Sequence, residues 1–243
     1  MSCGLRITHY KHHFTNNVFR FLLFALVLLT AACTATPPIT TPGTIHMQVT
    51  DAADPWLKQV INCQGSNFLS VEVRTADLLD PHSADIVIRI GQPEHLSSPV
   101  YQIGTDELLV IVNPQNPTQS LTASQVGGLF TGQIRTWETI SGTSALVQVW
   151  SFPADEDVQQ IFEQTVLGGS PLTSSARLAN NQHEMVQAVT KDVNAIGIIT
   201  QREKVVSGNI KDVFTAASSL LVLAITASRP QGTLASISAC LQK

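Results

Sequence analysis

Basic residues are scarce in this sequence of 243 residues. Lys and Arg together number 14, against 18 Asp and Glu, which gives a formal charge of −4 at pH 7. Arg6, Lys11 and Arg20 lie near the N-terminus, so the remainder of the chain is more acidic still. An acidic surface repels nucleic acid and anionic lipid headgroups. We therefore expect no nucleic-acid binding and no basic patch for membrane attachment.

Motifs that carry catalysis are also missing. The sequence has no H-E-x-x-H, no G-x-S-x-G and no phosphate-binding P-loop. It has no C-x-x-C and no His-rich spacing of the kind that binds zinc. The pair His183 and Glu184 falls on a predicted helix and is interpreted as polar surface. We predict that the chain is not an enzyme and that it uses neither a metal nor a cofactor.

The apolar run at residues 21–32 is too short to cross a bilayer, which takes roughly 20 apolar residues. It follows Arg20 and ends in Ala31 and Ala32 before Cys33, the order of a secretory signal. A cysteine in this place resembles the lipobox of bacterial lipoproteins, in which the thiol is acylated and becomes the mature N-terminus. Thr30 stands where that family prefers Leu, Val or Ile. The alternatives are an ordinary secretory signal, in which Cys33 is incidental, and a short membrane anchor.

The lipobox interpretation sets the N-terminal organisation. Residues 1–32 are the signal peptide, and residues 33–44, rich in Pro and Thr, are an extended tether. Acyl chains on Cys33 would hold an extracytoplasmic protein at the cell membrane. Once the signal and Cys33 are set aside, Cys63 and Cys240 remain. In an oxidising compartment they favour one disulfide, and two buried thiols are the alternative.

From residue 45 onward, short apolar runs alternate with amphipathic stretches and predict an α/β architecture. The runs are mostly continuous in Val, Ile and Leu, as in strands buried on both faces. The expected strands are residues 45–49, 69–73, 86–90, 108–112, 146–150, 196–199 and 220–225. The expected helices are residues 54–62, capped by Asp54 with Pro55 first, 122–132, opened by a Thr122–Gln125 capping box, 156–167, 181–191 and 234–241. This length favours one two-lobed unit.

Four segments between residues 106 and 200 resemble phosphate-type substrate-binding proteins of ABC transporters. The matching residues are Asn113, Pro114, Leu121, Thr122, Gln125, Phe130, Gly132, Trp137, Phe162, Gly168, Gly169, Asn180, Met185, Val189 and Gly197. The resemblance implies a type II periplasmic-binding-protein fold, in which each lobe is a mostly parallel sheet flanked by helices. It places the first lobe at residues 45–112 plus 203–243 and the second at residues 113–202. The implied partners are a small-molecule solute and an ABC permease, and a monomer is expected.

The ligand loops depart from this family. Its Ser-Gly-Thr turn falls on Glu156, Asp157 and Val158, preceded by Asp155, and its Arg falls near residues 152–153. Carboxylates at these positions would repel phosphate at close range. The candidate ligand residues are therefore Thr50, Asp51, Ala52, Arg89, Asp155, Glu156 and Asp157. Acidic loops suit a cationic, polyol or metal-linked solute. For any single acidic residue, the alternative is helix capping on a solvated surface.

These observations predict an extracytoplasmic, membrane-anchored solute-binding lipoprotein with the phosphate site largely lost. The alternative is an interaction or sensing lipoprotein that takes no part in transport and keeps the same scaffold. The resemblance also implies that the chain leaves the first lobe, builds the second and returns. Cys63 and Cys240 would then share one lobe, so we predict a disulfide between them.

Overall fold

The computed structural model describes residues 42–243, apart from residues 94 and 96. The predicted signal peptide, Cys33 and most of the tether lie outside the described residues. Within the described part, no helix combines the length and the apolar character needed to cross a membrane.

Eight strands form one mixed sheet in the order β2-β1-β3-β8-β4-β7-β5-β6. β1 pairs in parallel with β2 and β3, and β5 pairs in parallel with β6 and β7. The strands are β1 (Thr44–Val49), β2 (Phe68–Val73), β3 (Ile86–Ile90), β4 (Val100–Val112), β5 (Gln148–Ser151), β6 (Arg177–Leu178), β7 (Ala195–Thr200) and β8 (Lys211–Ile225).

Helices lie in most of the connections between these strands, and α8 follows the last strand. They are η1 (Asp51–Trp56), α2 (Leu57–Cys63), α3 (Ala123–Phe130), α4 (Glu138–Ser141), α5 (Asp157–Phe162), η2 (Glu163–Leu167), α6 (Gln182–Lys191), α7 (Gln201–Ser207) and α8 (Gly232–Leu241). The predicted capping box is confirmed, because Thr122 and Gln125 each accept the other's backbone N–H. The predicted cap at Asp54 is wrong. A 3₁₀ turn already begins at Asp51, so Asp54 and Pro55 lie inside it.

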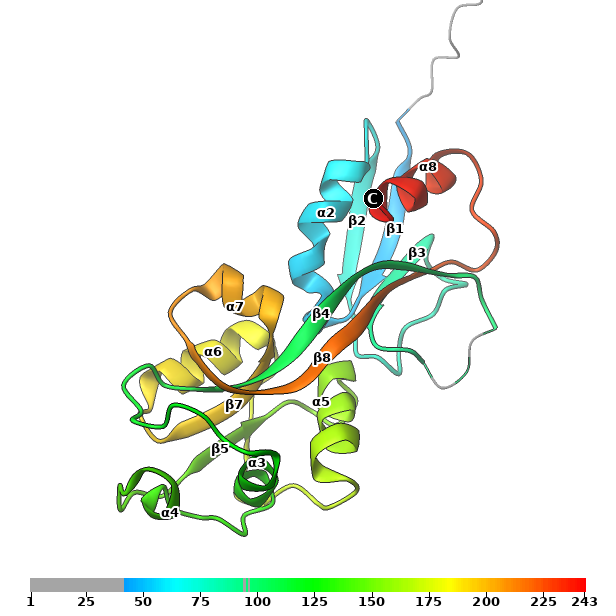
Figure 1. The fold of residues 1–243 in the computed structure, drawn as a ribbon. Coiled ribbons are helices and arrows are strands. Elements are labelled where there is room, and N and C mark those ends of the chain that lie inside the picture. Colours follow the sequence, from blue (N-terminus) through cyan, green and yellow to red (C-terminus); the bar gives the residue numbers. More distant parts are fainter. Residues whose placement is uncertain (1–41, 94, 96) are drawn as a thin grey trace, which may run out of the picture. The chain divides into compact units, whose positions relative to one another are not determined.

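The antiparallel pair β4 and β8 joins the two parallel groups of strands (Figure 1). β8 continues the β1–β3 group through its pairing with β3, and β4 continues the β5–β7 group through its pairing with β7. Both strands are much longer than the apolar runs that predicted them. Their additional residues are mostly half-buried or exposed and include many polar side chains, so a search for continuous apolar runs passes over them. The predicted α/β class is confirmed.

β2 contradicts the expectation that every strand is buried on both faces. It lies at one edge of the sheet, and five of its six residues are exposed, with Phe68 at 66%. Its Val and Leu residues were enough to suggest burial, but the position of a strand within a sheet is not encoded in its own composition. α4, β6 and α7 had no counterpart in the sequence prediction.

β3 is buried on both faces and separates two apolar clusters. Ile86, Ile88 and Ile90 belong to the main core. Val87 packs on the opposite face with Leu223 and Ile225 of β8. Successive side chains of a strand point to opposite faces, so Arg89 shares the face of Val87.

The predicted disulfide is present. Cys63 at the end of α2 is bonded to Cys240 in α8, with the two Cα atoms 5.8 Å apart and 177 positions between them in the sequence. The bond ties the last helix to the first part of the sheet, and α2 and α8 lie against each other.

We expect replacement of both Cys63 and Cys240 by Ser to lower the free energy of unfolding. The loss should approach roughly 5 kcal/mol, the chain-entropy value for a loop of this length. Urea unfolding measures it, with reduced wild-type protein as the control that should match the double variant. Non-reducing peptide mapping that finds both residues as free thiols would contradict the assignment.

Candidate functional site

Asp157, the first residue of α5, brings a buried carboxylate against the loops that follow β1 and β3. Its Oδ2 accepts hydrogen bonds from the Thr50 hydroxyl at 2.7 Å and from the Ile90 backbone N–H at 2.9 Å. Its Oδ1 accepts from the backbone N–H of Val158 at 2.8 Å. The residue is only 1% exposed. Three donors therefore surround one carboxylate in a water-excluded position.

Sheet topology places the two partners of Asp157 side by side. Thr50 follows the last residue of β1, and Ile90 is the last residue of β3. These strands are parallel neighbours, so their carboxyl ends lie at the same edge of the sheet. In α/β sheets, ligands bind beyond this edge. The carboxylate of Asp157 occupies such a position and comes from the other group of strands.

Gln182 makes a second connection and was missed by the sequence analysis. Its backbone N–H donates to Asp51 Oδ2 at 2.7 Å, and its side-chain Nε2 donates to the carbonyl of Ala52 at 3.4 Å. Its Oε1 accepts from the backbone N–H of Thr200 at 2.7 Å. The available signal was the start of α6, where Asn181 caps the helix by accepting from the Glu184 N–H and leaves Gln182 as the first helical residue.

Asp155 contributes to the site through its backbone. Its carbonyl accepts a hydrogen bond from the Ala76 N–H at 3.1 Å. This bond is a third link, after those of Asp157 and Gln182, and joins the segment before α5 to the loop that follows β2. The structure thus brings together Thr50, Asp51, Ala52, Asp155 and Asp157. Glu156 is buried among them at 6% exposure, and its Oε2 has no hydrogen-bond partner among the described residues.

Burial and mutual repulsion raise the pKa values of these acids. Burial raises the pKa of Glu156 to about 8, with further contributions from Asp157, Asp51 and Asp155. Burial also raises the pKa of Asp51 to about 6, against the lowering effect of the Gln182 N–H. For Asp157, burial raises the pKa, while its hydrogen bonds from Thr50 and Ile90 oppose the rise. Glu156 is therefore protonated at neutral pH.

Among the described residues, the Arg89 side chain makes no hydrogen bond to this cluster. Its side chain lines a hollow of about 610 Å³ beside α5, together with Asp157 and three carboxamides. The carboxamides are those of Gln92, Gln160 and Gln164. It also lines a second hollow on the Val87 side of β3. Within the described ranges, no group of three or more His, Cys, Asp or Glu could hold a metal ion.

Comparison with known proteins identifies the scaffold. A family model described as a PBP superfamily domain matches residues 101–233. A phosphate ABC transporter substrate-binding protein with bound phosphate, from Clostridium perfringens, has a similar structure, with a TM-score of 0.69 and 15% sequence identity. The match covers 82% of this chain and 92% of that one.

Two further solved structures show the same fold. An ABC-type phosphate transport receptor from Vibrio cholerae matches with a TM-score of 0.62 and 19% identity, over 82% of this chain and 93% of that chain. The apo regulatory domain of HypT from Salmonella typhimurium matches with a TM-score of 0.59 and 10% identity, over 83% and 95%. The predicted two-lobed type II fold is thereby confirmed. At these identities the likeness extends to the fold alone.

The raised pKa values predict stability that depends on pH. Folding favours the protonated forms of Glu156 and Asp51. Their contribution to the free energy of unfolding is therefore complete below their ordinary pKa values of 4.5 and 3.8. It is lost as the pH rises through about 6 for Asp51 and about 8 for Glu156. We expect the free energy of unfolding to fall over this range, at about 1.4 kcal/mol for each unit of pKa shift.

Glu156→Gln should remove the Glu156 part of this dependence, because the amide stays neutral at every pH. Urea unfolding at pH 5 and pH 9 should show the variant to be clearly more stable than the wild type only at pH 9. Glu138→Gln on the exposed surface of α4 is the control and should follow the wild type. Parallel wild-type and Glu156→Gln profiles would contradict the buried, protonated state.

Proposed function

The chain belongs to the PBP superfamily, and we propose that it is an extracytoplasmic, membrane-anchored solute-binding lipoprotein that has lost its phosphate site. Its relatives in fold include substrate-binding proteins of phosphate ABC transporters. We place its lobes at residues 45–112 plus 203–243 and at residues 113–202. An ABC permease is the partner that this role implies. We propose no catalytic activity.

The observation that carries the proposal is the bonding of Asp157. In the resembling family the corresponding turn, with its helix N-terminus, holds a bound anion. In this chain Asp157 supplies an anion of its own, and the Thr50 hydroxyl and Ile90 N–H already donate to it. A phosphate would have to displace this carboxylate and then lie near Asp51, whose pKa of about 6 leaves it largely ionised at neutral pH. Coulomb repulsion at such short range is several kcal/mol even with partial solvent screening, at about 4 kcal/mol for unit charges 4 Å apart.

The solute is proposed to be a polar molecule other than phosphate, and a polyol fits best. The hollow of about 610 Å³ beside Asp157 offers carboxamides from Gln92, Gln160 and Gln164, which both donate and accept hydrogen bonds. Asp77 and Asp157 add acceptors, and Arg89 adds donors. Such a mixed lining matches hydroxyl groups and carries no large excess of either charge.

A second candidate is an interaction or sensing lipoprotein that takes no part in transport. It is favoured by the direct hydrogen bonds between the proposed lobes, which the Thr50 hydroxyl donates to Asp157 and the Gln182 backbone N–H donates to Asp51. These bonds hold the lobes together without any solute. A solute panel that leaves thermal stability unchanged, combined with a stoichiometric protein partner, would select this function over solute binding.

We expect the wild-type protein to bind phosphate weakly or not at all. Asp157→Gly should free the donors of Thr50 and Ile90 and restore the glycine of the family's Ser-Gly-Thr turn. Phosphate or sulfate should therefore stabilise this variant. A ligand at 100 times its dissociation constant stabilises by about 2.7 kcal/mol, which thermal unfolding detects readily.

Asp155→Gly is the matched control, since the Asp155 carboxylate makes no hydrogen bond to Thr50 or Ile90, and it should gain no response to phosphate. Calorimetry that gives a micromolar phosphate constant for the wild type would contradict the loss of the site. Equal stabilisation of the Asp157→Gly and Asp155→Gly variants by phosphate would show that Asp157 is not the residue that blocks the phosphate site.

The proposed anchor predicts partition of the mature protein into detergent. Two acyl chains give stable membrane attachment where one is marginal, so the distribution should be nearly complete. Cys33→Ser should yield a protein in the aqueous phase or an uncleaved precursor. Phase separation in a detergent measures the distribution, and mass spectrometry of the N-terminus identifies the modification. An unmodified mature N-terminus at another residue would refute the lipobox.

A further inference from the structure

Arg89 carries a buried charge that no described side chain pairs with. It lies in the middle of the sheet on β3 and is only 9% exposed. Among the described residues its guanidinium has no hydrogen-bond acceptor and no carboxylate within ion-pair distance, and its Nε is fully enclosed without a partner. Burial of a charge without a hydrogen-bonded partner is costly. A binding partner from outside the chain would offset that cost.

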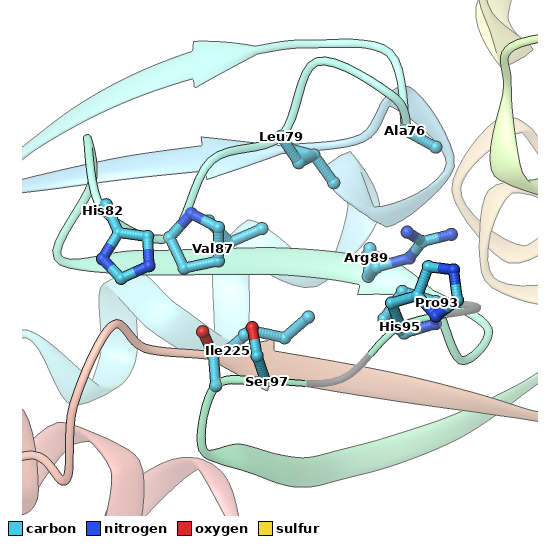
Figure 2. A pocket seen from close by; sticks show the side chains of 11 residues that line it. Ala76, Leu79, His82, Val87, Arg89, Pro93, His95, Ser97 and Ile225 are labelled. Atoms are coloured by element: carbon cyan, nitrogen blue, oxygen red, sulfur yellow. The ribbon is translucent and has the colours of Figure 1, made fainter.

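The guanidinium borders a hollow of about 200 Å³ on the Val87 face of β3, which we call the Arg89 pocket (Figure 2). Its apolar wall includes Leu79, Val87 and Ile225. Its polar groups are Arg89, His82, His95, Ser97 and Ser98, and none of its described lining residues is acidic. The carboxylates of Asp77 and Asp157 line only the larger hollow on the other side of Arg89. Among the residues that the structure describes, the Arg89 pocket is therefore the side of Arg89 that no carboxylate lines.

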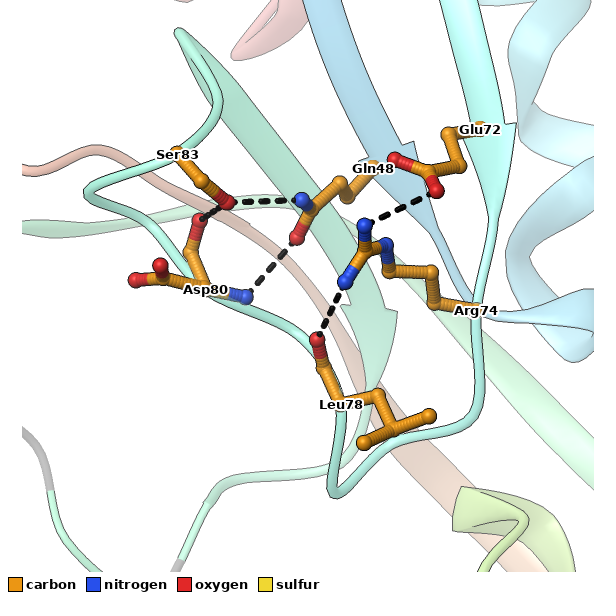
Figure 3. Close-up of polar contacts among 6 residues, drawn as sticks. All are labelled: Gln48, Glu72, Arg74, Leu78, Asp80 and Ser83. Carbon is orange, nitrogen blue, oxygen red and sulfur yellow. Dashed lines mark hydrogen bonds and ion pairs between the residues drawn. The ribbon is translucent and has the colours of Figure 1, made fainter.

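Hydrogen bonds hold the loop that forms one wall of the pocket (Figure 3). The side chain of Gln48 donates to the Ser83 hydroxyl at 2.9 Å and accepts from the Asp80 N–H at 2.8 Å. Arg74 pairs with Glu72 at 2.8 Å and donates to the carbonyl of Leu78 at 3.3 Å. Both ends of the loop are thus attached to strands β1 and β2. A wall fixed in advance loses little conformational entropy when a ligand binds.

We propose that the Arg89 pocket binds a small organic anion, with its carboxylate on the Arg89 guanidinium and a short apolar part against Leu79, Val87 and Ile225. Guanidinium and carboxylate match in geometry and form paired, charge-assisted hydrogen bonds. The volume equals that of about seven water molecules at ~30 Å³ each, so the ligand has few non-hydrogen atoms. The proposal does not depend on the identity of the cleft solute. The anion would occupy the Arg89 pocket, whereas the cleft solute would occupy the larger hollow on the other side of the Arg89 side chain.

Benzoate and butyrate are suitable probes, and benzyl alcohol and butanol are their neutral counterparts. We expect the carboxylates to raise the melting temperature of the full-length protein in detergent in a saturable manner, and the alcohols to have no such effect. In Arg89→Met the carboxylate affinity should fall about 10- to 100-fold, the worth of a hydrogen bond to a charged group. Without probe, this variant should melt at or above the wild-type temperature, since it no longer buries an unpaired charge.

A matched pair of bulky substitutions locates the ligand. Leu79→Trp fills the Arg89 pocket and should abolish the benzoate response, whereas Gln164→Trp fills only the larger hollow and should preserve it. The proposal is overturned if neither carboxylate stabilises the wild type, or if Arg89→Met responds like the wild type. It is equally overturned if Gln164→Trp loses the response and Leu79→Trp keeps it.

Discussion

One buried carboxylate organises the region between the two groups of parallel strands. Asp157 accepts hydrogen bonds from the loop after β1 and from the end of β3, although it belongs to a helix of the other group. These hydrogen bonds bury the carboxylate between the two groups of strands. Glu156 and Asp51 are buried beside it, and burial together with the nearby Asp157 carboxylate raises their pKa values. Removal of one partner from such a buried arrangement is strongly destabilising, because it leaves polar groups without hydrogen bonds. The acidic cluster is thus a consequence of how the two parts are held together.

β3 shows how one short strand can serve two chemically different surfaces. Its Ile side chains enter the main core, and its last N–H donates to Asp157. Arg89, one position earlier, points to the opposite face and keeps its charge away from that core. The alternation of side chains along a strand makes this separation possible within five residues. Arg89 therefore borders a hollow on the Val87 face in addition to the larger hollow that it shares with Asp157.

The sequence predicted the parts of the fold in which local pattern and tertiary position agree. β3 was predicted to the residue because four of its five residues are apolar. The helix after Thr122 was predicted because the capping interaction of Thr122 with Gln125 is local in sequence. Residues 100–107 of β4 and 211–219 of β8 were missed because polar residues interrupt the apolar ones there. Burial of β2 was wrongly expected because only the assembled sheet makes it an edge strand. The candidate loops were predicted by resemblance, and most of them meet in space. No local sequence pattern marks Gln182 as a contact between the two groups of strands. Arg89, in contrast, lies between Ile88 and Ile90 on a strand, so alternation could have predicted that its side chain points to the opposite face.

The position of β8 in the sheet has a consequence for the order of folding. β8 lies between β3 and β4, so without it the sheet divides into β2-β1-β3 and β4-β7-β5-β6. Until β8 (Lys211–Ile225) has been synthesised, β3 and β4 each present an unpaired edge, and exposed edges of this kind promote aggregation. Pairing of residues so far apart in sequence is also slow. The sheet is therefore completed only after β8 has been synthesised, and a chain that folds earlier leaves both edges open.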